Sequence, residues 1–154
     1  MPAILFVCTA NRFRSPLAAA CFQKELAVRK PDGDWQVSSA GTWTMDGQPA
    51  ALEAMKGARQ LGLDIRDHKS RIITAETIKN ADVILVMEQG QKEALCSEFP
   101  DSAFKVHLLS EAASGVAYDV PDPVSSAAAG EIPGEVDELI HAGFDRICAL
   151  ARKS

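Results

Sequence analysis

The sequence predicts an α/β domain with a four-stranded parallel sheet flanked by helices on both faces. Short apolar runs without polar alternation are typical of strands that are buried on both sides. Segments with helical features separate these runs, which favours parallel pairing of the strands. Right-handed crossovers then place helices on both faces of the sheet. At 154 residues, the chain is expected to form one domain, residues 1–154.

The first third of the chain is expected to contain two strands and one helix. The first strand covers about Ala3–Val7, where apolar residues follow one another. A helix is expected at about Ser15–Arg29, because Pro16 suits a first helical turn and strong helix formers follow it. The second strand is short, about Trp35–Ala40, and ends at Gly41.

The middle of the chain is expected to contain two helices and a strand. One helix covers about Ala50–Leu61. Thr74 is a suitable cap for a short helix that ends at Asn80. The third strand, Val83–Met87, is entirely apolar. The apolar residues near helical spacing in the first of these helices are Leu52, Met55 and Leu61.

The last third adds a helix at about Gln89–Cys96, a fourth strand at Phe104–Leu109 and a long helix at about Gly134–Arg152. A loop rich in Asp, Pro and Ser, Tyr118–Ala129, precedes the last helix. The apolar stripe expected to face the core from that helix comprises Val136, Leu139, Ile140, Phe144, Ile147 and Leu150.

Composition excludes several classes of function. The net charge of −5 argues against non-specific binding to nucleic acid or to a membrane surface. No apolar stretch approaches the ~20 residues of a membrane span, and the N-terminus lacks a signal peptide pattern, so a cytoplasmic location is expected. The four cysteines include no C-x-x-C pair, so a zinc site is not expected. Arg14 and backbone N–H groups near Cys8 would stabilise the charge of a bound phosphoryl group, so no metal is needed, and no cofactor is expected.

The pair Cys8 and Arg14 carries the clearest chemical signal. Cys8 is expected in a loop between the carboxyl end of a strand and the start of a helix, where backbone N–H groups and the helix dipole attract an anion. The same field favours a thiolate. Arg14 adds a planar, permanently charged group that suits a phosphate-like oxyanion. The pattern therefore predicts attack by sulfur on a bound phosphoryl group, although a chance C-x5-R match has odds of roughly one in five.

Asp122 is the candidate proton donor. It lies between Pro121 and Pro123, which keep the backbone extended and stiff. A stiff loop suits a carboxyl group that must deliver one proton to one place. The simpler alternative is that these Asp-Pro pairs only form a turn.

Five segments occur in an order that resembles the low-molecular-weight protein tyrosine phosphatases. They are Ile4–Pro16, Ser39–Thr42, His68–Arg71, Ala81–Glu88 and Asp119–Pro123. The resemblance covers nearly the whole chain. It implies a phosphate loop at Cys8–Ser15, hydrolysis of a phosphorylated protein or a small aryl phosphate, and a phosphate or other oxyanion bound in the loop.

The resemblance also implies roles for individual residues. Cys8 would be the nucleophile, Arg14 would bind the equatorial phosphoryl oxygens, and Asp122 would be the general acid. Ser15 would hydrogen-bond the thiolate and help to expel it. Asn11 would hold the loop through hydrogen bonds to Ser39 and His68. The other loop positions expected near the phosphoryl group are Thr9, Ala10, Arg12 and Phe13.

Several positions depart from the family pattern. Ala10 stands where glycine is common, so the loop must tolerate a Cβ there. Phe13 stands where a second cysteine is common, so we expect no reversible disulfide within the loop and easier over-oxidation of Cys8. Val124-Ser125-Ser126 replace aromatic residues at the mouth of the pocket. Arg12 either faces solvent or contacts an anionic group of the substrate.

Other functions remain open at this point. An arsenate reductase of the same fold would need further redox cysteines in a mobile segment directly after the third strand; this segment begins at Met87 and holds one cysteine, Cys96. A phosphoarginine phosphatase is another alternative. A threonine in the loop favours that activity, and in this sequence Arg12 occupies the position where the threonine would be expected. A phosphate-binding module without turnover would need neither a nucleophile nor an acid. We expect Glu88 to be either functional or a helix cap. The protein is expected to be a monomer or a weak dimer. Structural roles are expected for Cys21, Cys96, Cys148, His107 and His141.

Overall fold

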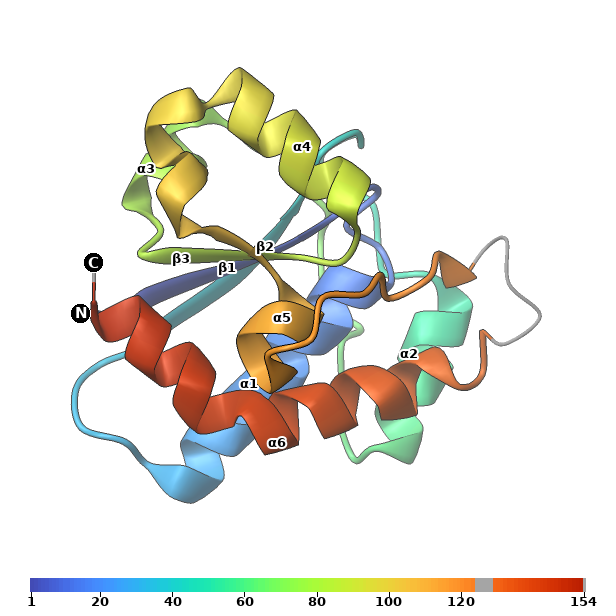
Figure 1. Ribbon diagram of the computed structural model, residues 1–154. Coiled ribbons are helices and arrows are strands. Elements are labelled where there is room, and N and C mark those ends of the chain that lie inside the picture. The colour runs from blue at the N-terminus through green and yellow to red at the C-terminus, as the bar shows by residue number, and fades with distance from the viewer. Residues whose placement is uncertain (124–128, 154) are drawn as a thin grey trace.

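The computed structural model describes residues 1–123 and 129–153 and has the expected parallel α/β architecture (Figure 1). Its four-stranded sheet has the order β2-β1-β3-β4, with every neighbouring pair parallel. The strands are β1 (Ala3–Cys8), β2 (Gln36–Gly41), β3 (Val83–Val86) and β4 (Val106–Leu108).

The apolar character of the central strands follows from burial on both faces. In β1, the side chains of Ile4 and Phe6 pack into one core cluster, while those of Leu5 and Val7 pack into the other. All four are at most 1% exposed. A strand with water on one face would alternate apolar and polar residues, so the continuous apolar run identifies a central strand.

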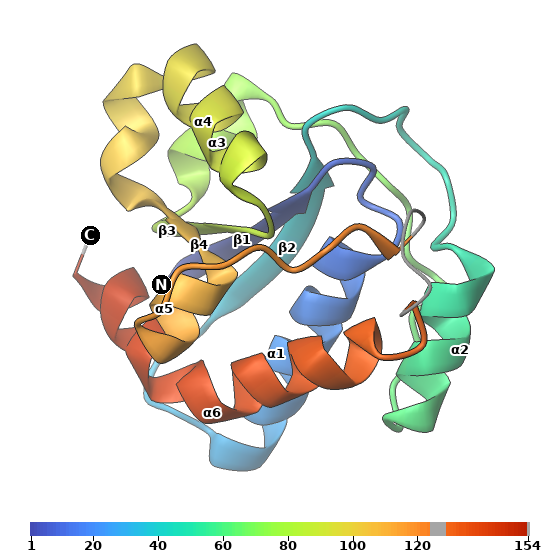
Figure 2. The same ribbon diagram turned by 45° about the vertical axis from the view of Figure 1, so that its right-hand side comes forward.

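Helices cover both faces of the sheet (Figures 1 and 2). One face carries α1, α5 and α6, with α2 beside the ends of α1 and α6, and the other face carries α3, α4 and the 3-10 helix η1. The helices are α1 (Arg14–Arg29), α2 (Leu52–Gln60), α3 (Ala75–Asn80), α4 (Gln89–Glu98), η1 (Pro100–Lys105), α5 (Leu109–Ser114) and α6 (Ile132–Arg152). None of the described helices is long and apolar enough to span a membrane.

The amphipathic pattern was correct for α6. In the second predicted helix it was correct for Met55 and Leu61, which pack against the core partly buried, and wrong for Leu52. In α6, the expected stripe faces the core, with four of its residues buried and Leu139 and Leu150 partly buried. In α2, Leu52 is 80% exposed, and the buried face consists of small residues, including Gly57. A Cβ on Gly57 would lie 2.3 Å from the Pro133 ring, so the close approach of α2 to α6 excludes larger side chains there.

The predicted fourth strand, Phe104–Leu109, was too long at both ends. Phe104 belongs to η1 and is 74% exposed, and Leu109 begins α5, which was not predicted. The strand is short because η1 ends directly before Val106 and α5 begins directly after Leu108. Helix α5 is only six residues long and ends at Gly115, whose φ of 82° is left-handed and suits glycine.

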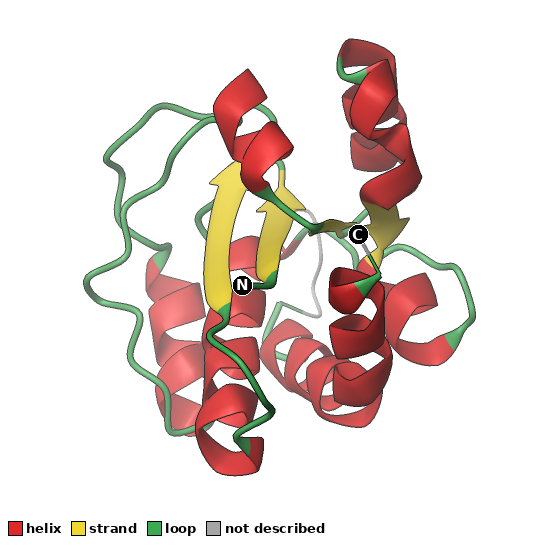
Figure 3. Ribbon diagram, turned by 90° about the vertical axis from the view of Figure 1, so that its left-hand side faces the viewer, coloured by secondary structure: helices red, strands yellow, loops and turns green. Residues whose placement is uncertain are grey.

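The two ends of the sheet differ in what they carry. Both chain termini lie at the side that faces the viewer in Figure 3, where the strands begin. Cys8 and Gly41 pair at the opposite end, where β1 and β2 finish, and Glu88 follows β3 at that end. Because ligands of such sheets bind beyond the carboxyl ends of the strands, this end is where the functional site is expected.

Candidate active site

The loop between β1 and α1 has its backbone carbonyls tied to neighbouring segments. The carbonyl of Cys8 accepts a hydrogen bond from the Thr42 N–H, and the carbonyl of Thr9 accepts one from the Trp43 N–H, both at 3.0 Å. These bonds continue the β1–β2 pairing past the ends of the strands. The carbonyl side of the loop is therefore fixed against the segment that follows β2.

The backbone N–H groups of the same loop have no such partners. Within the described part of the chain, none of the N–H groups of residues 9–13 donates a hydrogen bond. Asn11, in the middle, has a left-handed φ of 57°, and a reversal of this kind can turn successive N–H groups towards one concave side. A row of unpaired amides at the start of a helix is suited to an oxyanion.

Asn11 holds this unusual conformation through bonds in several directions. Its side-chain amide donates to the hydroxyl oxygens of Ser15 (2.8 Å) and Ser39 (2.9 Å), and its side-chain oxygen accepts from the N–H of Arg71 (3.0 Å). Its backbone carbonyl accepts from Nε2 of His68 at 2.6 Å, which places the proton of that imidazole on Nε2. Asparagine tolerates left-handed φ better than most residues, so both its backbone and its side chain suit this position.

The thiol of Cys8 lies at the base of the loop and is 2% exposed. Its sulfur is 3.0 Å from the Ser15 hydroxyl oxygen. The Asn11 amide donates to that oxygen, and the Ser15 hydroxyl hydrogen can point to the sulfur. The chain Asn11–Ser15–Cys8 can therefore place a hydroxyl donor against the sulfur of Cys8.

Arg14 is buried beside the loop and anchored on one side. Its Nη1 group donates to Oε2 of Glu88 at 2.8 Å and to the carbonyl of Val120 at 2.9 Å. Its Nε and Nη2 groups make no hydrogen bond within the described residues. The guanidinium is thus fixed by one nitrogen while two others remain available. Glu88, expected to be either functional or a helix cap, has both positions, since it is the N-cap residue of α4 and the ion-pair partner of this arginine.

Gln91 connects Glu88 to the loop and was not predicted from the sequence. Its Nε2 group donates to Oε2 of Glu88 (3.1 Å) and to the Thr9 hydroxyl (3.0 Å). Its Oε1 atom accepts from the N–H groups of Met87 and Glu88. Only its place one helical turn after β3, at the carboxyl end of the sheet, could have indicated it.

The two departures inside the loop have simple structural explanations. Ala10 does not have a positive φ, so its Cβ needs no strained backbone, and the expectation that the loop tolerates alanine agrees with this geometry. Phe13 is 9% exposed and packs into the main core cluster. The position that does need glycine is Gly41, because a Cβ there would lie 2.6 Å from the carbonyl oxygen of Thr9.

Arg12 links the loop to the segment that precedes α2. Its Nε group donates to the carbonyl of Pro49, and its own carbonyl accepts from the N–H of Ala51, both at 2.8 Å. The side chain is half-buried. The Arg12 side chain is therefore neither freely solvated nor wholly available to the substrate, because one side of its guanidinium has a structural role.

The loop that carries Asp122 is anchored at Val120. The N–H of Val120 donates to the carbonyl of Met87 at 2.9 Å, its carbonyl accepts from Arg14, and its side chain is fully buried. Asp119 accepts from the N–H of Gln89 at the start of α4. Asp122 is half-buried two residues further on. Positions 124–126, where this sequence has Val-Ser-Ser in place of aromatic residues, lie outside the described residues.

Two other cysteines are buried away from this loop. Burial, with a further contribution from Asp137, raises the pKa of Cys21 to about 12. Burial also raises the pKa of Cys148 to about 11. Both therefore remain protonated thiols at neutral pH, which is unsuited to a nucleophile. Cys96 lies on α4, half-buried against the second core cluster.

The fold and this loop define an α/β protein with a cysteine at the base of an oxyanion-binding loop. Residues 3–152 match the family model described as low molecular weight phosphotyrosine protein phosphatase. The chain belongs to this family, as its sequence motifs indicated. It is therefore a hydrolase that acts on phosphoric monoesters.

Similar proteins in the family differ in the activity that their names state. A protein-arginine-phosphatase from Geobacillus stearothermophilus is 33% identical over 142 residues, 88% of this chain and 92% of that protein. An arsenate reductase from Staphylococcus aureus (strain Newman) is 35% identical over 104 residues, 68% of this chain and 72% of that protein. The crystal structure of a low molecular weight protein tyrosine phosphatase from T. tengcongensis is 32% identical, with a TM-score of 0.86 over 95% of this chain and 99% of that one.

Proposed function

We propose that residues 1–154 act as one catalytic domain that hydrolyses phosphotyrosine in proteins through a cysteinyl-phosphate intermediate. The observation that carries this proposal is the loop of residues 9–13, in which the carbonyls of Thr9, Asn11 and Arg12 accept hydrogen bonds from other segments, while the backbone amides have no partner in the described chain. This loop surrounds a cysteine whose sulfur lies 3.0 Å from the Ser15 hydroxyl oxygen. A binding module would need the amides but not the thiol.

Arg14 and the loop amides would hold the phosphoryl group. The free Nε and Nη2 groups of Arg14 can form a bidentate pair with two phosphoryl oxygens. The bonds from its Nη1 group to Glu88 and Val120 fix the guanidinium before substrate binds. Phosphoryl transfer depends mainly on positioning and on stabilisation of charge, and fixed donors supply both.

The reaction would proceed in two displacements. In the first, the Cys8 thiolate attacks phosphorus, the bond from phosphorus to the tyrosyl oxygen breaks, and Asp122 gives its proton to that oxygen. In the second, the Asp122 carboxylate takes a proton from water, the water oxygen attacks phosphorus, and the sulfur–phosphorus bond breaks. The Ser15 hydroxyl would stabilise the departing thiolate, and inorganic phosphate would be released.

Arg12 favours phosphotyrosine over phosphoarginine as the substrate. The bond to Pro49 keeps its guanidinium at the edge of the loop. A phosphoarginine side chain brings a second guanidinium to the same place, and like charges repel at close range. A neutral aromatic ring brings no such charge. Arsenate reduction is less well supported, because Cys96 is the only cysteine in the segment that follows β3.

Turnover of a phosphotyrosyl peptide and of para-nitrophenyl phosphate tests the proposal. Cys8→Ser should abolish both activities, while Cys96→Ser serves as the matched control. Asp122→Ala should slow hydrolysis by about 10²–10⁴-fold for phosphotyrosine and by less for para-nitrophenyl phosphate, whose leaving group needs less protonation. Turnover by Cys8→Ser at the wild-type rate would refute the mechanism.

The choice of substrate is tested with Arg12→Ala. Removal of the charge should raise the ratio of phosphoarginine to phosphotyrosine hydrolysis, compared under the same conditions. It should also reduce activity on an acidic phosphotyrosyl peptide more than on a neutral one. If wild type prefers phosphoarginine, or if both ratios are unchanged in Arg12→Ala, Arg12 does not select the substrate.

A further inference from the structure

We propose that the cavity between β4, α5 and the last turns of α6 is a second ligand site, which binds a small molecule bearing a carboxylate or phosphate group. The cavity has a volume of about 520 Å³. This volume lies within the range of about 300–1,000 Å³ that is typical of small-molecule sites. None of its lining residues belongs to the loop around Cys8.

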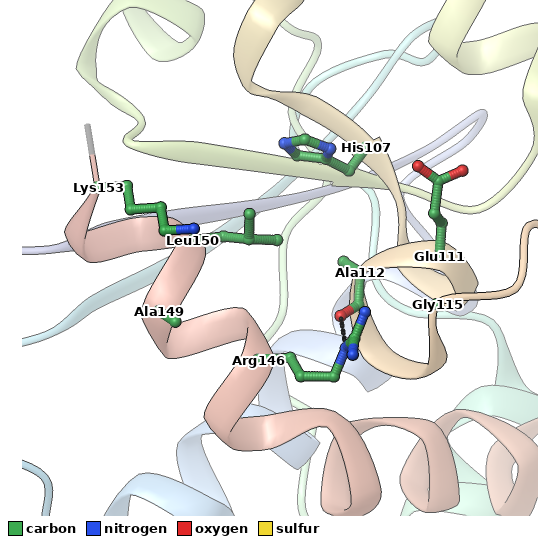
Figure 4. Close-up of a pocket in the computed structure, with 8 residues that line it drawn as sticks. All are labelled: His107, Glu111, Ala112, Gly115, Arg146, Ala149, Leu150 and Lys153. Atoms are coloured by element: carbon green, nitrogen blue, oxygen red, sulfur yellow. Dashed lines mark hydrogen bonds between the residues drawn. The ribbon is translucent and has the colours of Figure 1, made fainter.

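Two cationic side chains line the cavity, Arg146 on α6 and Lys153, the residue that directly follows this helix. Arg146 and Lys153 are seven residues apart, which places them two turns from each other on the same side of the helix, about 10 Å along its axis. In Figure 4, both side chains lie on the side of α6 that faces α5 and β4. Against a net charge of −5 for the whole chain, this is a local concentration of positive charge.

The position of Arg146 is fixed without using all its donors. Its Nε group donates to the carbonyl of Ala112 at 3.2 Å (Figure 4). The turn at Gly115 leaves room for the guanidinium, because a Cβ there would lie 3.2 Å from Nη2. Neither Nη group makes a hydrogen bond within the described part of the chain. Two pre-oriented N–H donor groups therefore remain for an anion.

His107 and Glu111 add polar groups without partners on the other side of the cavity. The flanking residues of His107 in β4 are buried in the second core cluster, so its imidazole points to the opposite face of the sheet, into the cavity. Neither the imidazole nor the Glu111 carboxylate makes a hydrogen bond to the described residues. Burial, aided by the charge of Lys92, lowers the pKa of His107, so its neutral ring can both donate and accept.

Together these features define the class of ligand. An anionic group fits between Arg146 and Lys153, and a polar group fits against His107. Leu150 and Ala112 provide apolar surface between them. Four polar side chains line one cavity without hydrogen bonds to one another, and a few polar groups in a concave site are typical of small-molecule binding. A metabolite-sized carboxylate or phosphate fits this pattern better than a purely apolar compound.

The site is connected to the loop of the proposed general acid, and this part of the inference rests on the proposed function. Ser110, next to Glu111 in α5, is buried; its hydroxyl donates to the carbonyl of Tyr118 at 2.5 Å and accepts from the Tyr118 N–H at 2.9 Å. Tyr118 begins the segment that carries Asp122. A ligand that restrains α5 therefore also restrains the start of the catalytic loop.

Binding is tested by NMR titration of the wild-type chain with inorganic phosphate and, separately, with succinate. The amide signals of Ala112 and Gly115 and the imidazole signals of His107 should shift saturably with at least one of the two probes, and the tighter probe identifies the preferred anion. Arg146→Gln should weaken this binding about tenfold, equivalent to one charge-assisted hydrogen bond. Arg152→Gln is the matched control, because it removes the same charge from the same helix at a residue that lies over Trp35.

The signals of residues 9–13 provide an internal reference. Phosphate should shift them equally in wild type and in Arg146→Gln. Saturable shifts confined to residues 9–13 would overturn the second site and leave the proposed function intact. Saturating succinate should also change kcat in wild type and not in Arg146→Gln. Binding of succinate without any change in kcat would overturn the connection to the catalytic loop.

Discussion

Gly41→Ala should show how closely β2 supports the phosphate loop. Gly41 does not have a positive φ, so alanine can adopt its backbone conformation. The difficulty is space, since the new Cβ would lie 2.6 Å from the Thr9 carbonyl oxygen and 3.2 Å from the carbonyl carbon of Ala10. The backbone of Gly41 cannot retreat easily, because its N–H and carbonyl are bonded to Arg71 and Ile73.

The size of the effect follows from these distances. To reach an ordinary contact, the loop must move by about 0.5 Å or more. Because a misplacement of 1 Å can cost about 100-fold in rate, we expect roughly a tenfold fall in kcat/KM. Overpacking against the backbone should cost about 1–3 kcal/mol of stability. For a chain of this length, that corresponds to a fall in Tm of very roughly 2–12 °C.

Steady-state kinetics with para-nitrophenyl phosphate and a thermal melt measure both effects. Gly134→Ala is the control, because its site on α6 is exposed and has no atom within 4 Å of the added Cβ. That variant should keep the wild-type kcat/KM, and its Tm should not fall, because alanine is the better helix former at an exposed position. If Gly41→Ala instead retains kcat/KM within twofold and its Tm within 1 °C, the loop does not depend on this contact.

Three further perturbations probe the surroundings of the loop. Glu88→Gln weakens the bond that anchors Arg14 and should lower kcat/KM by about ten- to a hundredfold. The control is Glu93→Gln, at an exposed position of α4, which should leave kcat/KM unchanged. Equal activities of the two variants would mean that Arg14 is positioned by other bonds. Peroxide should inactivate the enzyme through Cys8 in a way that thiols do not reverse, and full recovery of activity would reveal a protecting partner thiol. The raised pKa of Cys21, about 12 against 9.0, means that the unfolded chain ionises first, so stability should fall as the pH rises above 9. Urea melts from pH 8 to 11 should show a smaller decline for Cys21→Ala, and parallel declines would assign the pH effect to other groups.

The sequence was most informative where one local pattern determines one structure. The apolar runs of β1 and β3 need burial on both faces, and the pattern of Pro16 and the residues after it marks the start of α1. Prediction from the sequence failed where tertiary packing decides which side chains are buried. Leu52 is the example: it lies on the exposed side of α2, because only small residues fit against α6. The end of β4 was missed because the same apolar residues, such as Leu109, suit a buried strand or a buried helix.

The site shows the same division between local and distant information. Cys8, Arg14 and Ser15 lie within eight positions, and their place between a predicted strand and a predicted helix indicated an oxyanion loop. The bonds that orient them come from far along the chain, with Glu88 74 positions and Val120 106 positions from Arg14. No local pattern specifies these pairings, since they depend on which strands are neighbours in the sheet.

The two arginines of the loop illustrate how position converts the same side chain into different roles. Arg14 begins α1 and is buried, and Glu88 and Val120 hold it through one nitrogen so that the rest of its guanidinium is available. Arg12 lies two residues earlier, in the loop itself, and its Nε group is used by Pro49. Loss of Arg14 should therefore remove the binding of the phosphoryl group, whatever the substrate. Loss of Arg12 should change which substrates are accepted, because its charge and its hold on residues 49–51 act at the edge of the site rather than on the phosphoryl group.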